Sequence, residues 1–114
     1  MPKGNYLGDF EQLVMLALMR LGHLAYGMTV RRELEEIADR RVSLGAIYAT
    51  LDRLEVKGLV TSFLGAPGNE RRGRAKRFFR VTAGGVRALR ASLGSMDRMR
   101  QGIDGLDRLV GVTS

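Results

Sequence analysis

Hydrophobic residues recur at helical spacing in four stretches of this chain, and they alternate with polar residues in two shorter stretches. The helical spacing predicts four helices, over residues 9–21, 29–40, 43–58 and 83–114. The alternation predicts two strands, over residues 59–64 and 76–82. Three glycines and a proline lie between the strands, so we expect the strands to pair as a β-hairpin.

The first predicted helix is apolar on every side in its middle turns. Asp9 and Gln12 form a capping-box pattern at its start, and Gly22 follows its end. A helix without a polar face has to be covered on both sides, and a chain of 114 residues supplies one modest core. We therefore expect its second side to pack against another subunit.

The second predicted helix begins at the N-cap Thr29 and leads into the third through a short connection, residues 39–42. Its apolar stripe predicts four buried residues, Val30, Leu34, Ile37 and Ala38. Two helices joined this closely are typical of a helix-turn-helix. Three helices followed by a hairpin predict a mainly α fold with a small β-hairpin, a winged helix-turn-helix.

The third predicted helix has the strongest pattern in the chain. Ser43 is a suitable N-cap and Gly58 a suitable left-handed stop. Its buried face is predicted to be Leu44, Ile47, Tyr48, Leu51 and Leu54. Its opposite face carries Gly45, Ala46, Ala49, Thr50 and Arg53. Mostly small residues let a helix backbone approach a partner closely, and the DNA major groove is one such partner.

The final helix carries an apolar stripe that predicts a seam between two subunits. The stripe consists of Val86, Leu89, Leu93, Met96, Ile103, Leu106 and Val110. Together with the first helix it predicts a dimer interface or effector pocket, made of Met15, Leu18, Met19, Leu89, Leu93, Met96 and Met99. Two interpretations of the methionines stay open at this point, plain packing and an adaptable pocket for a small hydrophobic effector.

The charge of the chain is unevenly distributed. Residues 1–58 carry eight Lys or Arg and eight Asp or Glu, whereas residues 59–114 carry eleven and four, so the second half holds the whole net charge of +7. Six cations crowd into the hairpin, Arg71, Arg72, Arg74, Lys76, Arg77 and Arg80. Such clustering indicates a polyanion partner, and the alternative is a solubilising loop.

The composition argues against several classes of function. The chain has no cysteine and one histidine, His23, so we expect no metal site, no cofactor and no enzymatic activity. The longest apolar run, residues 13–19, is too short to span a bilayer, and the first residues lack the apolar stretch of a signal peptide. These features favour a cytoplasmic protein.

The chain resembles the PadR-like family of transcriptional regulators over about residues 9–90. The pattern Ser-x-Gly-x-x-Tyr-x-x-Leu-x-x-Leu-Glu-x-x-Gly-Leu of that family is present from Ser43 to Leu59, and a basic and aromatic wing ending runs from Lys76 to Gly85. The chain departs from the family at Leu44, where proline is frequent, and at Phe79, where tyrosine is usual. It has no tryptophan, so the effector mode of small members that bind ligands between tryptophans is not carried over.

The resemblance implies a homodimer that binds double-stranded DNA and represses transcription, with residues 1–82 as the DNA-binding domain and residues 83–114 as a C-terminal dimerisation helix. The expected base contacts are Ser43, Gly45, Ala46, Ala49 and Thr50. The expected phosphate contacts are Arg53, Lys57, Arg71, Arg72, Arg74, Lys76 and Arg77. Tyr48 could pack in the core or reach a phosphate. The alternative function is a winged-helix module that binds an acidic protein instead of DNA.

Overall fold

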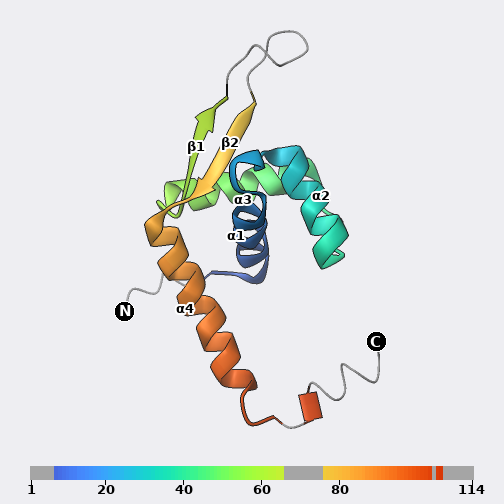
Figure 1. Ribbon diagram of the computed structural model, residues 1–114, viewed down its shortest axis with the longest axis vertical. Coiled ribbons are helices and arrows are strands. Elements are labelled where there is room, and N and C mark those ends of the chain that lie inside the picture. The colour runs from blue at the N-terminus through green and yellow to red at the C-terminus, as the bar shows by residue number, and fades with distance from the viewer. Residues whose placement is uncertain (1–6, 66–75, 104, 107–114) are drawn as a thin grey trace.

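The computed structural model describes residues 7–65, 76–103 and 105–106, and a short β-hairpin projects from one end of its helices (Figure 1). In chain order the elements are α1 (Asp9–Leu21), the 3₁₀ turn η2 (Gly22–Leu24), α2 (Gly27–Ala38), α3 (Leu44–Val56), β1 (Val60–Leu64), β2 (Arg77–Val81) and α4 (Ala83–Arg100). This order confirms the mainly α fold with a β-hairpin.

The hairpin is antiparallel and gains a third segment from the turn before α2. Val60 pairs with Val81, Ser62 with Phe79, and Leu64 with Arg77. The Phe79 N–H donates to the Ala25 carbonyl at 2.9 Å. Two strands alone are marginally stable in water, so this extra segment and the packing on the helices stabilise the sheet.

The core surrounds α1, which contacts α2, α3, β2 and α4. Its largest fully buried side chains are Phe79, Met15, Ile47, Leu51, Leu54, Val14, Val30 and Val60. Met15, Leu18 and Leu89, predicted to form a dimer interface or effector pocket, are at most 3% exposed in a single protomer and belong to its core. They are covered because the chain surrounds α1 with its own elements.

Helix α1 spans Asp9–Leu21 as predicted, but its cap differs from the prediction, and α2 begins earlier than predicted. The N-cap of α1 is Gly8, whose N–H donates to Glu11 at 3.0 Å, and Asp9 pairs with Arg40 at 2.6 Å. Helix α2 begins at Gly27, two residues before the predicted cap Thr29.

The hydroxyl of Thr29 lies in the first turn of α2, where it accepts from the Tyr26 N–H at 3.0 Å. A capping hydroxyl can therefore act from inside the first turn, and sequence alone does not separate the two arrangements. Ile37, predicted to be buried, is 59% exposed because the last turn of α2 extends past the core.

Helix α4 is shorter than predicted, and it runs away from the core (Figure 1). It ends at Arg100, Gln101 is extended, and Gly102 has a φ of 84°. Ile103 and Leu106 therefore lie beyond the helix, and Val110 lies outside the described residues. At the start of α4, a Cβ on Gly85 would lie 2.1 Å from the Leu59 carbonyl oxygen, so glycine allows the helix to meet the hairpin.

Candidate nucleic-acid interface

The first turns of α3 present small, exposed residues. The Ser43 hydroxyl accepts from the Ala46 N–H at 3.0 Å and caps the helix as predicted. Gly45, Ala46 and Ala49 are all exposed. None of these residues is charged, so the surface can approach a groove closely without a long side chain intervening.

Thr50 does not belong to this exposed face, and the prediction that it does is wrong. It is 2% exposed, and its hydroxyl accepts from the Arg53 guanidinium at 3.2 Å. It lies close to the boundary between the two faces of the helix, and contact with the core turns it inward. Base contact by Thr50 would require α3 to rotate.

Tyr48 is half-buried and packs against two other elements. Its ring centroid lies 6.3 Å from that of Phe79. A Cβ on Gly27 would lie 2.4 Å from the Tyr48 hydroxyl oxygen, so the start of α2 can approach Tyr48 this closely only with glycine at that position. These contacts favour the packing interpretation for its ring.

The last turns of α3 are held by Glu11 of α1. The Lys57 ammonium donates to the Glu11 carboxylate at 3.0 Å, and the Arg53 Nε lies 3.9 Å from it. Burial acts to raise the pKa of Glu11, but the hydrogen bond from Gly8 and the two cations outweigh burial and hold the pKa below its ordinary value. Arg53 and Lys57, both predicted to contact phosphates, are therefore ion-paired within the chain.

Four residues connect the inner face of the hairpin to α3, and we call them the hairpin brace: Arg77, Asp52, Glu55 and Ser62. The Arg77 guanidinium lies 2.8 Å from Glu55 and 3.4 Å from Asp52. The Ser62 hydroxyl donates to the other Glu55 oxygen at 2.8 Å. The guanidinium also lies 4.8 Å from the centre of the Phe79 ring. Arg77, a predicted phosphate contact, thus has carboxylate partners of its own.

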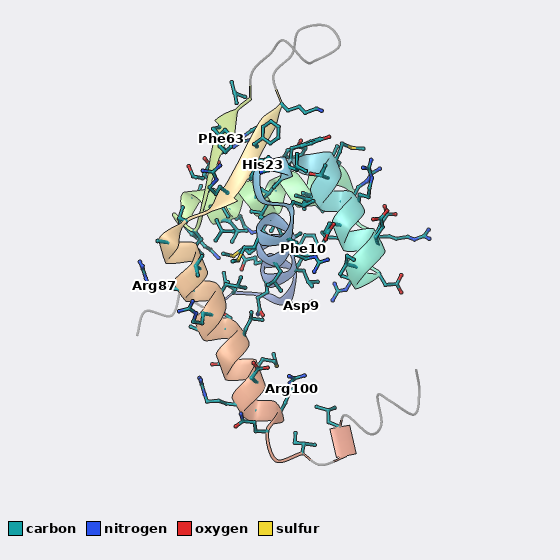
Figure 2. All side chains as sticks on the ribbon, viewed as in Figure 1. Asp9, Phe10, His23, Phe63, Arg87 and Arg100 are labelled. Carbon is teal, nitrogen blue, oxygen red and sulfur yellow. The ribbon has the colours of Figure 1, made fainter. Side chains whose placement is uncertain are left out.

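The outer face of the hairpin pairs its cations with aromatic rings. Phe63, which Figure 2 labels on the hairpin, stacks on Phe78 with ring centroids 5.8 Å apart. Arg80 lies 5.2 Å from the Phe63 ring centre, and Lys76 lies 4.5 Å from that of Tyr26. These contacts keep the two cations at the surface. The predicted contacts Arg71, Arg72 and Arg74 lie outside the described residues.

The described part of the chain has neither a metal-binding cluster nor a membrane-spanning helix. No group of three or more His, Cys, Asp or Glu side chains there is arranged to hold a metal ion. No helix there is long and apolar enough to cross a membrane.

Comparison with known proteins identifies the family. The sequence profile of the PadR-like family of transcriptional regulators matches residues 15–91, so the chain belongs to this family. No curated protein matches the chain. A PadR family transcription regulator from Clostridium difficile is similar in structure, with a TM-score of 0.70 and 18% identity over 85% of this chain and 96% of that one.

Two further solved structures support the same fold. A PadR-like transcription factor from Bacteroides fragilis has a TM-score of 0.68 and 22% identity over 85% of this chain and 88% of its own. A PadR family transcriptional regulator from Eggerthella lenta has a TM-score of 0.63 and 26% identity, over 87% and 81%. The chain is therefore a winged-helix transcriptional regulator of the PadR family.

The structure adds residues that the sequence reasoning missed. Glu11, Asp52 and Glu55 are the carboxylates that bind the cations of α3 and β2. Tyr26 and Phe63 contribute rings to the outer face of the hairpin. The Leu-Glu-x-x-Gly spacing placed Glu55 on α3, but pairing it with Arg77 requires the fold.

Proposed function

We propose that this chain is a homodimeric transcriptional repressor that places α3 of each protomer in the major groove of a twofold-symmetric operator. The observation that carries this proposal is the small, exposed and uncharged first half of α3. A surface of this kind suits close approach to base edges. A dimer seated on such an operator would block transcription from an overlapping promoter.

The base contacts in this proposal are Ser43, Gly45, Ala46 and Ala49. Alanine methyl groups suit contact with a thymine methyl, and the serine hydroxyl can donate to or accept from several bases. Lys76 and Arg80 at the hairpin surface supply phosphate contacts, and we assign the same role to Arg71, Arg72 and Arg74. Phosphate contacts position the protein on the duplex, whereas base contacts select the sequence.

The proposed dimer rests on exposed apolar side chains at the outer half of α4. Met96 is 57% exposed and Met99 is 75% exposed. On α1, Met19 is 50% exposed. Exposed apolar side chains on two elements favour a protein partner, and a second copy supplies matching surfaces. Leu93 and these methionines are then the interface positions that remain from the sequence prediction.

A small hydrophobic effector belongs to the proposal in a narrower form than the sequence suggested. Met15 and Leu89 are buried, whereas Leu18 and the exposed Met19 line a surface pocket with Val81 and Val86, so an effector would contact Leu18 and Met19 there. Binding of a hydrophobic dye at one per dimer, with a change in DNA affinity, would support this. Binding that leaves DNA affinity unchanged would count against it.

The decisive experiment is selection of the protein against a random duplex library, with its mass in solution measured in parallel. Enrichment of a twofold-symmetric sequence by a dimer supports the proposal, and transcription from a promoter carrying that sequence then tests repression. A monomer at micromolar concentration would contradict the dimer. Equal binding to all duplexes would contradict sequence reading, and no binding even at low salt would favour the acidic-protein alternative.

A further inference from the structure

Arg77 of the hairpin brace lies at the end of the two strands farthest from the core. Arg77 is the first residue of β2 and pairs with Leu64, the last residue of β1. Near the other end, Val60 and Phe79 are almost completely buried, which fixes the hairpin base by packing. Leu64, in contrast, is 71% exposed, so hydrophobic burial does not fix the far end.

The contacts of the brace engage both strands with a single helix. Glu55 accepts from Ser62 of β1 with one oxygen and from Arg77 of β2 with the other. Asp52, three residues earlier on α3, lies 3.4 Å from the second terminal nitrogen of Arg77. The planar guanidinium is thus held by two carboxylates and by the face of Phe79. The Arg77 side chain is 40% exposed, so a phosphate that approached it would compete with these two carboxylates for the guanidinium.

We infer that Arg77 is a positioning residue for DNA binding, which orients the basic hairpin relative to α3, and that it is not a phosphate contact. Arg77 is adjacent in sequence to Lys76, a proposed phosphate contact, and lies on the same hairpin as Arg80, so the brace fixes the strand that carries these cations relative to α3. The inference rests on the proposed function, because the hairpin has to be oriented with respect to DNA.

Three variants separate positioning from phosphate contact: Arg77→Gln, Glu55→Gln and the double variant. The probe is the duplex that the wild-type protein selects from a random library, titrated at several salt concentrations. If Arg77 acts through Glu55, each single variant loses about tenfold in affinity and the double variant loses no more than either, because coupled residues are not additive. The slope of log affinity against log salt stays at its wild-type value in all three.

A direct phosphate contact by Arg77 predicts different results for the same variants. A phosphate contact by Arg77 would flatten the salt slope by about 0.9 per protomer in Arg77→Gln. Glu55→Gln would then keep or increase affinity, because the freed guanidinium could reach the backbone. Either observation would overturn the inference. Arg87→Gln is the matched control: it removes the same charge from an exposed site on α4, where Figure 2 shows Arg87 pointing away from the core.

Amide hydrogen exchange tests the brace without DNA. In Arg77→Gln and in Glu55→Gln we expect several-fold faster exchange at the hairpin amides from Val60 to Val81, with α1 exchange unchanged. Unchanged hairpin exchange would overturn the inference even if the wild-type protein bound no duplex. Failure of the wild-type protein to select a sequence, with the exchange result as expected, would contradict the proposed function but support the part of the inference that the brace holds the hairpin against α3.

Discussion

The two halves of α3 differ in what surrounds their side chains. From Ser43 to Ala49 the outward residues are small, exposed and uncharged. From Asp52 to Lys57 the outward residues are charged, apart from the exposed Val56, and Glu11 of α1 or Arg77 of β2 holds the charged ones in ion pairs. The same helix therefore has one half without charged contacts to the rest of the fold and one half fixed to its neighbours.

A cation on a helix proposed to bind DNA is therefore not necessarily a phosphate contact. A Lys or Arg that already has a carboxylate partner would have to exchange that partner for a phosphate, so its net gain is small. The anchored half fixes the angle of α3, and the exposed half is left to approach the duplex. Each prediction below changes one half and leaves the other intact.

A negative charge placed on the exposed half of α3 should reduce DNA affinity more than any other change considered below. Ala49→Glu puts a carboxylate on the proposed groove surface, and we expect DNA affinity to fall on the order of 100-fold because like charges repel strongly at a close interface. The free energy of unfolding should change by no more than about 0.5 kcal/mol, since the position is exposed. Fluorescence anisotropy and urea unfolding measure the two quantities.

Ala91→Glu is the matched control, because it makes the same substitution at an exposed helical position on α4. It should leave DNA affinity near the wild-type value. Similar losses in both variants would point to net charge as the cause and would remove the distinction between the two halves.

The next largest effect is a loss of stability when the last turns of α3 lose their ion pair with Glu11. Glu11→Ala removes the carboxylate that binds Lys57 and leaves the Gly8 N–H without its acceptor. We expect the free energy of unfolding to fall by about 2 kcal/mol, because hydrogen bonds to charged groups contribute more than neutral ones while the cations here keep partial contact with water. A loss below about 0.5 kcal/mol in urea unfolding would show that the anchor contributes little.

Two substitutions of Ser43, each with a smaller expected effect on stability, distinguish its capping role from a contact with DNA. Ser43→Ala should lower the free energy of unfolding by about 1 kcal/mol, because the Ala46 N–H loses its acceptor. Ser43→Asp keeps a capping oxygen and should retain stability, yet its charge should weaken DNA binding. If Ser43→Asp bound DNA as tightly as the wild-type protein, Ser43 would lie outside the interface.

The elements of this fold were predictable because their signals are local. Caps and glycine stops lie within a few residues of the helix ends, so Ser43, Gly22 and Gly58 marked real boundaries. Thr29 placed the predicted start of α2 two residues too late, because a threonine can cap a helix from inside its first turn. The end of α4 was missed, since a periodic apolar pattern can continue past the point where Gly102 turns the chain.

The site was less predictable because its contacts connect distant segments. Lys57 and Glu11 are 46 residues apart, and Arg77 and Glu55 are 22 apart. Sequence showed which residues were charged but not which charges were already paired. Burial was equally dependent on tertiary packing, which turned Thr50 inward and enclosed Met15 within the chain.

The smallest effect is a pH dependence in the anchored half. Burial alone would raise the pKa of Glu11. The Gly8 hydrogen bond, Lys57 and Arg53 together lower it by more than burial raises it, so the folded-state pKa lies below that of the unfolded chain. A lowered carboxylate pKa stabilises the fold fully above the unfolded-state value, about 4.3, and this stabilisation is lost as the pH falls through the folded-state pKa. The difference in unfolding free energy between the wild-type protein and Glu11→Gln should therefore stay constant above about pH 5.5 and narrow on acidification.

Urea unfolding from pH 7 downward measures this difference. A difference that widens below pH 5 would mean that burial outweighs the two cations, and that the last turns of α3 are anchored by hydrogen bonds to a neutral Glu11 instead of by ion pairs.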